Sequence, residues 1–239
     1  MNSHKFCFII CTNDELMLSE CLHYIRHLEI PQGYDIDLLT IKDAPSMTSA
    51  YQSAMSDSDA KYKIYLHQDV FILNKHILKD LLDIFSSDPL IGMIGAVGYE
   101  TVSSDGIMWH APRKGAVYSP KSAMSYPPLS KYRYSLQEDG YSYVAEIDGL
   151  FMATAYDLPW DTVQLRGLDF YDAFQSMNFL KNGYRIAVPS QKHPWCLHDD
   201  NVLLNMAQYD FYRKLFCSRC QNLLGKSYAQ ISEMFKQNN

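Results

Sequence analysis

The fold is decided by the stretch Ile64-Tyr65-Leu66-His67-Gln68-Asp69-Val70. Its apolar start has the short, continuous hydrophobic character of a strand that is buried on both faces of a parallel sheet. The strand then ends abruptly in three polar side chains. Because ligands of open α/β sheets lie beyond the carboxyl ends of the strands, the same stretch also indicates where a ligand binds.

Strand and helix patterns alternate on both sides of this stretch over the first 100 residues. Strands are predicted at 5–11, 36–41, 62–66 and 89–97, and helices at 16–28, 47–55 and 72–85. The order β-α-β-α-β-α-β predicts an open parallel sheet with right-handed crossovers.

The second half of the chain is less regular. The elements predicted there are strands at 141–147 and 150–154, a helix from about Asp169 to Lys181, a strand at 184–188 and helical structure from 202 onward. Residues 117–134 contain three prolines and no clean period. We expect them to form a loop, either a cover over the active site or a surface excursion. No internal repeat or linker interrupts the chain, which predicts one domain over residues 1–239.

The composition excludes several classes of protein. A net charge of −6, from 21 basic and 27 acidic residues, leaves no basic surplus for an extended nucleic-acid surface. No apolar run approaches the roughly 18 residues that a transmembrane helix needs. Six cysteines, at positions 7, 11, 21, 196, 217 and 220, are scattered as expected for reduced thiols. We therefore expect a cytoplasmic protein with no nucleic-acid partner and no transmembrane segment.

His67 and Asp69 are candidate metal ligands. They stand two residues apart, so their side chains point the same way if the strand geometry persists. A carboxylate suits a hard cation such as Mg2+ or Mn2+, which can neutralise a diphosphate. The alternative is an ordinary polar strand end at the surface.

Four separated segments give the chain a resemblance to family 2 type glycosyltransferases, in particular to a bacterial glycosyltransferase-like branch whose strand motif is His-Gln-Asp-Val. These segments are Ile9 to Glu15, Ile41 to Ser46 with Ala50 to Gln52, His67 to Val70, and Asp169 to Asp172 with Asn182 to Arg185. The resemblance implies an α/β fold of the GT-A type nucleotide-diphospho-sugar transferases, with an open, mixed but mostly parallel sheet flanked by helices. It also implies a nucleotide-binding half (1–100), an acceptor-binding half (101–200) and C-terminal helices (201–239).

The resemblance places a divalent metal, Mn2+ or Mg2+, on Asp69. The family's motif is usually Asp-x-Asp, and His67 stands where the first Asp would be. In the family that first residue more often faces the ribose or a bound water, although His67 could also bind the ion directly, which would favour Mn2+. A later histidine commonly completes such sites and points to His198, with His193 in reserve. Asp199 could orient the His198 ring.

The resemblance also assigns residues to the nucleotide-sugar donor. It implies that Asp43 accepts the N3–H of a uracil ring and that Thr12 and Asn13 line the same pocket. The alternative interpretation of Asp43 is that it is a turn residue before Ala44-Pro45. Asp148 and Gly149, at a polar break between two apolar strands, are implied to approach the donor sugar and its diphosphate, with the glycine permitting close approach of the backbone.

Asp172 is the expected catalytic base. It matches the family's acidic residue at the start of a helix, although an acid in a first helical turn also compensates the helix dipole. Asp169 and Asp172 could exchange the roles of base and helix cap. The side chains that could contact an acceptor, or simply form a solvated loop, are Trp109, His110, Arg113 and Lys114.

Together these interpretations predict an enzyme of polysaccharide biosynthesis. It would be an inverting glycosyltransferase that moves a sugar from a nucleotide donor, UDP-linked by expectation, to a hydroxyl of a saccharide or glycan precursor. A non-catalytic nucleotide-sugar binding protein is the first alternative, because His67 replaces a motif Asp and Gln52 stands where the family often has Asn. The second alternative is a metal-dependent hydrolase built from His67, Asp69, His198 and Asp199. A structural zinc site is the competing interpretation of His198 with the cysteines at 196, 217 and 220.

Overall fold

The structure is a computed structural model, and it describes residues 1–119, 140–199 and 205–237. The covering loop predicted over 117–134 lies outside the described residues from position 120 onward. Within the described residues, no helix combines the length and the apolar character that crossing a bilayer requires.

Seven strands of the described residues form one sheet, in the order β2-β1-β3-β10-β5-β11-β8. Their bounds are β2 (Asp35–Lys42), β1 (Asn2–Thr12), β3 (Ala60–His67), β10 (Phe151–Thr154), β5 (Ile91–Gly95), β11 (Arg185–Pro189) and β8 (Tyr141–Tyr143). β1 is parallel to β2 and β3, and β11 is parallel to β5. β10 and β8 are antiparallel to their neighbours. The predicted open, mixed and mostly parallel sheet is confirmed.

β10 occupies a position that the alternation of strands and helices does not predict. That alternation places β5 beside β3 as the next parallel strand, but β10 lies between them and pairs antiparallel with both. All its side chains are buried, and its first residue, Phe151, pairs with Leu66 at the end of β3. The backbone N–H of His67 then donates to the carbonyl of Leu150 at 3.3 Å. The turn before β10 is therefore held against the end of β3.

Alternate residues of β1 enter two separate cores. Phe8 belongs to a core that includes the buried faces of α1 and α3, and Ile9 belongs to one that includes α2 and α5. The helices are α1 (Glu15–Arg26), α2 (Met47–Asp57), α3 (Ile77–Ser87), α5 (Tyr171–Lys181), α6 (Met206–Arg219) and α7 (Tyr228–Lys236), with a short 3-10 turn η1 (Met108–His110). The continuous apolar run of β1 is thus covered by helices on both faces of the sheet.

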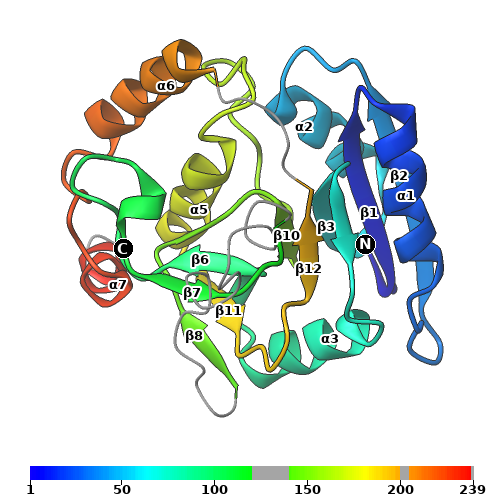
Figure 1. Ribbon diagram of the computed structural model, residues 1–239. Coiled ribbons are helices and arrows are strands. Elements are labelled where there is room, and N and C mark those ends of the chain that lie inside the picture. The colour runs from blue at the N-terminus through cyan, green and yellow to red at the C-terminus, as the bar shows by residue number, and fades with distance from the viewer. Residues whose placement is uncertain (120–139, 200–204, 238–239) are drawn as a thin grey trace.

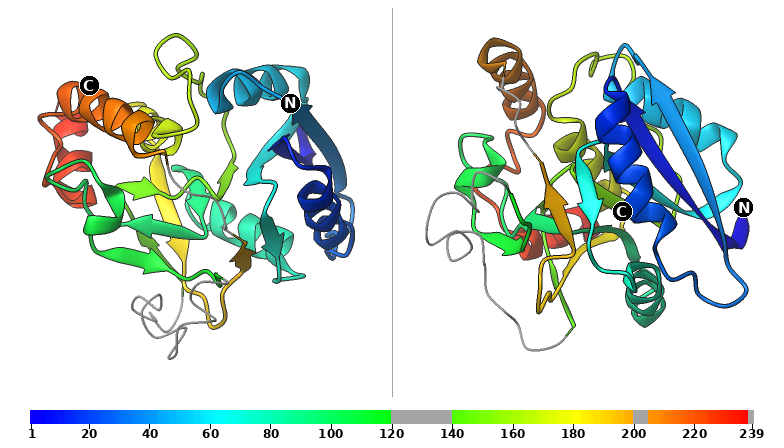
Figure 2. Two further views of the ribbon diagram at one scale, coloured as in Figure 1. Left: turned by 45° about the horizontal axis from the view of Figure 1, so that its top comes forward. Right: turned by 45° about the vertical axis from the view of Figure 1, so that its right-hand side comes forward.

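The first and the last described elements lie on opposite sides of the molecule. Figure 1 shows β1, β2 and α1 on one side and α6 and α7 on the other, with α5 between them. Figure 2 shows the same separation from two further directions.

The helix predicted at 72–85 begins later, at Ile77, because Ile72 ends a strand and a turn separates that strand from the helix. β4 (Val70–Ile72) pairs antiparallel with β12 (Cys196–His198), and its β-branched residues suit this buried ladder. The pairing sets His198 opposite Val70, next to Asp69. Two segments more than 120 residues apart are thereby joined at the end of β3.

Two strands predicted as continuous are each divided. The run at 89–97 becomes β5 and β6 (Val97–Tyr99), and the run at 141–147 becomes β8 and β9 (Glu146–Ile147). β6 and β9 leave the main sheet and join β7 (Arg113–Gly115) in a smaller sheet of order β7-β6-β9. β5 ends at Gly95, where a side chain has no room: a Cβ there would lie 2.7 Å from the side chain of Ile147 in β9.

β3 carries a buried lysine whose ion-pair partner, Asp157, is partly exposed. The Lys63 side chain is 0% exposed, and its ammonium contacts both carboxylate oxygens of Asp157 at 2.9 Å. It also donates to the carbonyl of Ala60 at 2.7 Å. A buried ammonium is tolerated only while such partners offset the loss of its hydration.

We expect Asp157→Ala to lower the free energy of unfolding by about 3 kcal/mol, because it leaves the Lys63 charge buried without its counter-ion. Urea unfolding measures the loss. The matched control is Asp37→Ala, which removes a 45% exposed partner of Lys5 and leaves Asp59 in contact with that lysine. The control should cost less than about 1 kcal/mol. Equal losses in the two variants would contradict the role given to the Lys63–Asp157 pair.

Candidate active site

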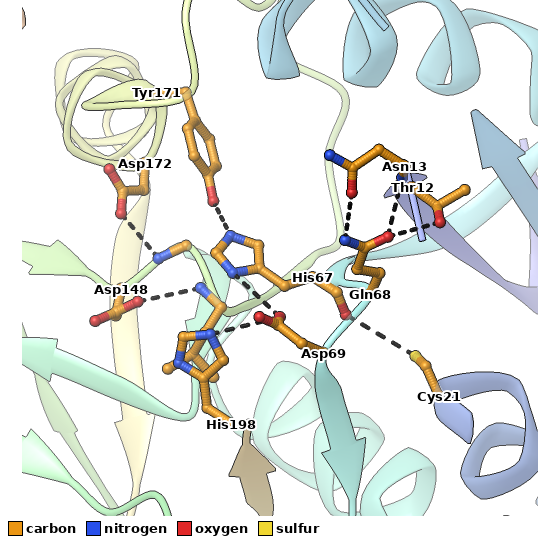
Figure 3. Close-up of polar contacts among 12 residues, drawn as sticks. Thr12, Asn13, Cys21, His67, Gln68, Asp69, Asp148, Tyr171, Asp172 and His198 are labelled. Atoms are coloured by element: carbon orange, nitrogen blue, oxygen red, sulfur yellow. Dashed lines mark hydrogen bonds and ion pairs between the residues drawn. The ribbon is translucent and has the colours of Figure 1, made fainter. Parts of the chain in front are cut away.

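Three candidate ligands converge at the end of β3, as Figure 3 shows for His67, Asp69 and His198. Oδ1 of Asp69 lies 4.0 Å from Nδ1 of His67 and 3.5 Å from Nε2 of His198. One potential ligand atom from each residue lies within 4.8 Å of the others. In the described part of the chain this is the only group of three or more His, Cys, Asp or Glu residues so arranged. The group could hold one divalent cation.

Asp69 is suited to remain ionised in this group. Burial by itself raises the pKa of Asp69, but the hydrogen-bonding contact from His198 and the nearby imidazole of His67 outweigh it, so the pKa lies below its ordinary value. The backbone carbonyl of Asp69 accepts from the N–H of Asp199 at 2.8 Å, which fixes the chain on which the carboxylate is carried. An ionised, positioned carboxylate is the form that binds a hard cation.

His67 is held from the side opposite Asp69. Its Nε2 lies 2.5 Å from the hydroxyl of Tyr171, the first residue of α5. A Cβ on Gly149 would lie 2.1 Å from that hydroxyl oxygen, so the glycine leaves the space that Tyr171 fills. Gly149 is thus explained by packing of the tyrosine. The sequence pattern predicts no separate role for Tyr171, although its place directly before Asp172 indicates that it lies near the site.

Gln68 points away from the ligand group and ties β3 to the end of β1. Its Oε1 accepts from the hydroxyl of Thr12 at 2.7 Å and from the backbone N–H groups of Asn13 and Asp14, each at 3.0 Å. Its Nε2 donates to Oδ1 of Asn13 at 2.7 Å. From the sequence alone, no role is assigned to Gln68. The period-2 alternation within the motif was the signal for it, since residue 68 must face away from 67 and 69.

A first cavity of about 420 Å³ opens beside the ligand group. The residues that line it are Cys11, Thr12, Asn13, Asp43, Ala44, Ser46, Met47, His67, Gln68, Asp69 and Leu168. Asp43 is exposed there with φ of 47°, a left-handed conformation that Asp tolerates better than most residues. Its N–H donates to the carbonyl of Thr12 at 3.1 Å. The structure therefore brings Thr12, Asn13 and Asp43, which the family resemblance assigns to the nucleotide, to one cavity.

A second cavity of about 660 Å³ also borders the group. Its polar lining consists of His67, Asp69, Asp148, Asp169, Asp172, His198, Asn205 and Gln208, and its apolar and aromatic lining of Met108, Trp109, Leu168, Phe170, Tyr171 and Tyr209. His67, Asp69 and Leu168 line both cavities. Two members of the ligand group thus lie at the shared wall, and His198 lines the second cavity.

Asp172 faces the second cavity from the first turn of α5. Its Oδ2 accepts from the N–H of Gly149 at 2.9 Å, and its Oδ1 accepts from the N–H of Ala173 at 2.8 Å. Burial, assisted by the charge of Asp148, raises the pKa of Asp172 to about 7. A carboxylate whose pKa is near neutrality can take up a proton during a reaction at physiological pH.

Asp169 does not cap α5, and Asp148 stabilises a turn. The residue at the N-cap of α5 is Phe170, with φ of 63° and no side-chain cap, so neither Asp169 nor Asp172 caps the helix in the way the sequence suggested. Asp148 Oδ1 accepts from the N–H of Leu150 at 3.1 Å and closes the turn before β10.

Several candidates lie away from this group. His193 is exposed and lines a different cavity, with Trp195 and Lys75. Cys217 donates to the carbonyl of Asp105 at 3.4 Å, and no cysteine belongs to the ligand group found in the described residues, so the structural zinc site is not supported.

The remaining acceptor candidates have local partners: His110 contacts Asp105, Lys114 contacts Glu100, and Arg113 lies over the ring of Tyr99. Trp109, by contrast, lines the second cavity.

A family model described as "glycosyltransferase like family" matches residues 7–220. Among solved structures, residues 1–349 of S. aureus TarS in complex with UDP give a TM-score of 0.57 at 13% identity, over 97% of this chain and 70% of that one. The same protein with UDP-GlcNAc gives 0.55 at 12% identity, over 97% and 71%. The mannosyltransferase PcManGT from Pyrobaculum calidifontis, in complex with GDP-Man and Mn2+, gives 0.58 at 11% identity, over 99% and 69%.

At such low identity these likenesses show a shared fold, and they confirm the predicted GT-A type. The curated proteins contain no match to this chain.

We expect the isolated protein to bind Mn2+ through the group of His67, Asp69 and His198. Replacing a ligand should cost at least what loss of a supporting residue costs, about 10- to 100-fold in affinity. Titration followed by the electron paramagnetic resonance of free Mn2+ should therefore show weakened binding for Asp69→Ala and for His198→Ala. His193→Ala is the matched control and should bind like the wild type. A loss in the control, or none in the two ligand variants, would contradict this group.

Proposed function

This chain belongs to the glycosyltransferase-like family and is a sugar-transferring enzyme; we propose that it moves a sugar from a nucleoside-diphosphate donor of the UDP class to a hydroxyl of a saccharide, with inversion at the anomeric carbon. The observation that carries the proposal is that His67 and Asp69 line both cavities, while His198, the third member of their group, lines the second. This shared wall suits a reaction in which a nucleotide lies on one side and the group being transferred lies on the other.

The ligand set fits a divalent transition ion. It offers one carboxylate and two imidazoles, whereas Mg2+ prefers an all-oxygen environment, so we favour Mn2+ over Mg2+. When bound, the ion would supply positive charge to the departing diphosphate. The complex of PcManGT with GDP-Man and Mn2+ supports a metal in an enzyme of this fold.

The first cavity suits the nucleotide. We assign Thr12, Asn13 and Asp43 to the base and ribose, with the exposed Asp43 carboxylate as acceptor for an N–H of the base. All of its lining residues except Leu168 come from the first 100 residues, which supports a nucleotide-binding half. UDP and UDP-GlcNAc bound to TarS support a uridine donor.

The second cavity suits the donor sugar and the acceptor. Asp148 lines this cavity at the turn before β10, where the transferred sugar would pass, and Gly149 in the same turn donates its N–H to Asp172. Most of the lining residues belong to the 101–200 segment, which supports an acceptor-binding half, and α6 adds Gln208 and Tyr209.

Asp172 is our candidate for the general base. The acceptor oxygen would attack the anomeric carbon as the bond to the diphosphate breaks, and the Asp172 carboxylate would take the hydroxyl proton. Each of its oxygens accepts one backbone N–H and keeps further acceptor capacity. One displacement of this kind inverts the anomeric configuration.

We expect Asp172→Asn to lower transfer by at least about 100-fold while nucleotide binding is kept. Release of UDP or GDP from a panel of nucleotide sugars, with Mn2+ and saccharide acceptors, measures this. Because the pKa of Asp172 is about 7, the wild-type rate should rise with pH, about tenfold per unit below that value, and level off above it.

Asp169→Asn is the matched control for that measurement. It should keep most of the activity, and a larger loss there than in Asp172→Asn would reverse the assignment.

The folded state retains the Asp172 proton at pH values where the unfolded chain has lost it, so this residue reduces stability as pH rises from about 4 to about 7. The melting temperature of Asp172→Asn should therefore fall less between pH 5 and pH 8 than that of the wild type. A binding protein would show no turnover, and a metal-dependent hydrolase would not require a nucleotide.

The lining of the second cavity favours a neutral saccharide as acceptor. Trp109 is 43% exposed there, and its ring lies 5.0 Å from that of Tyr209, which holds it in place. An anchored aromatic face can stack on a sugar ring, and Asn205 and Gln208 offer amide groups to hydroxyls. None of the described lining residues is Lys or Arg, so the cavity offers no permanent cation to an anionic acceptor.

We expect Trp109→Ala to raise the KM for a neutral oligosaccharide acceptor by about tenfold, a loss of about 1.4 kcal/mol of binding. Trp109→Phe should recover much of it, because a ring remains. Hydrolysis of the donor without acceptor should be unchanged in both variants. A preference of the wild type for polyol phosphates over neutral oligosaccharides would contradict the acceptor class. A role in polysaccharide biosynthesis in the cytoplasm remains a prediction.

A further inference from the structure

The two ring nitrogens of His67 face different partners. Nε2 contacts the Tyr171 hydroxyl at 2.5 Å, and Nδ1 faces the Asp69 carboxylate, as Figure 3 shows. The separation of 4.0 Å between Nδ1 and Oδ1 of Asp69 is too long for a hydrogen bond. It is short enough for both atoms to reach one ion at metal–ligand bond lengths of about 2.1 Å.

The Tyr171 hydroxyl cannot easily move from this position. The residue is 4% exposed, and the absence of a Cβ on Gly149 leaves the space in which its oxygen lies. Its ring lies 5.8 Å from that of Tyr51 and 6.3 Å from that of Trp160, both buried. The tyrosine is thus held by the core and by its place as the first residue of α5.

We propose that Tyr171 is a positioning residue that holds His67 with its Nδ1 free of a proton, so that His67 is a direct ligand of the divalent cation. In this tautomer the Nε2–H of His67 donates to the tyrosine oxygen, and the Nδ1 lone pair on the side of Asp69 would be available to a bound cation. A metal-binding histidine commonly has its second nitrogen fixed in this way. The inference rests on the proposed function, because it requires that the group bind a metal.

The histidine in the motif affects which metal ion the site prefers. An imidazole in place of the first carboxylate of an Asp-x-Asp motif removes one negative charge and adds a nitrogen ligand. Nitrogen ligands favour transition ions over Mg2+. Tyr171 therefore contributes to the choice of ion as well as to its affinity, because without it the ring is free to turn Nδ1 away.

The test is Mn2+ and Mg2+ binding to Tyr171→Phe, which removes the hydroxyl and keeps the ring. Mn2+ affinity should fall by about 10- to 100-fold, and the preference for Mn2+ over Mg2+ should shrink. Tyr51→Phe is the matched control: it removes a neighbouring buried hydroxyl that has no hydrogen-bond partner in the described structure, and should bind both ions like the wild type. Equal binding by Tyr171→Phe and wild type would overturn the positioning role.

A spectroscopic measurement gives the tautomer directly. Nitrogen NMR of the Mg2+-loaded wild type should show His67 protonated on Nε2, and the signal should lose this preference in Tyr171→Phe. A proton on Nδ1 in the loaded wild type would overturn the proposal while leaving a metal site on Asp69 and His198. If the wild type bound neither ion and still transferred sugar, the metal part of the proposed function would fail, and this inference would fail with it.

Discussion

The antiparallel pairing of β10 with β3 is the constraint on which the site depends. It sets Phe151 opposite Leu66 and closes Leu150 onto the backbone of His67. The turn before β10 then brings Gly149 within hydrogen-bonding distance of Asp172. Since every backbone group in a buried ladder must keep its partner, the position of this turn cannot drift without breaking the centre of the sheet. One strand pair therefore fixes the histidine, the glycine and the base of the proposed reaction relative to one another.

Burial and neighbouring charges separate the roles of acidic residues that lie close together. Asp69 is surrounded by two imidazoles and has a lowered pKa, whereas burial and Asp148 raise the pKa of Asp172 to about 7. Burial, with the charge of Asp172, also raises the pKa of Glu146 to about 8, so that side chain stays protonated at neutral pH. Pairs of acids with pKa values driven apart are typical of catalytic sites. The negative lining of the second cavity also attracts a cation.

An aromatic cluster beneath the site gives it a rigid base. Tyr51, Tyr65, Trp160 and Tyr171 are all buried, and neighbouring ring centroids lie between 4.8 and 6.3 Å apart. Close-packed rings resist displacement because any shift loses contacts on several sides. The hydroxyl of Tyr171 is the point at which this core touches the ligand group. Core packing and the polar chemistry of the site are thus joined through a single side chain.

The sequence by itself determined the elements and the chemistry of their ends. The buried strands, the helices between them and the polar ending at His67 to Asp69 follow from local periodicity, because a strand or helix buries its face in the same pattern wherever it lies. The position of Asp69 could be inferred for the same reason, since ligands of open α/β sheets lie beyond the carboxyl ends of the strands. The grouping of Thr12 and Asn13 with Asp43 was implied by the family resemblance. The choice of His198 and Asp172 came from a family resemblance, and periodicity alone would not have found either.

Only the tertiary structure decided which distant segments meet at that edge. The insertion of β10 between β3 and β5, the β4–β12 pairing that carries His198 to Asp69, and the contact of Tyr171 with His67 are all long-range pairings. No local pattern encodes them, because a strand's own residues specify that it must be paired but leave its partner open. The partner is chosen by packing of the whole chain, and that choice placed the tyrosine, the glycine and the second histidine around one carboxylate.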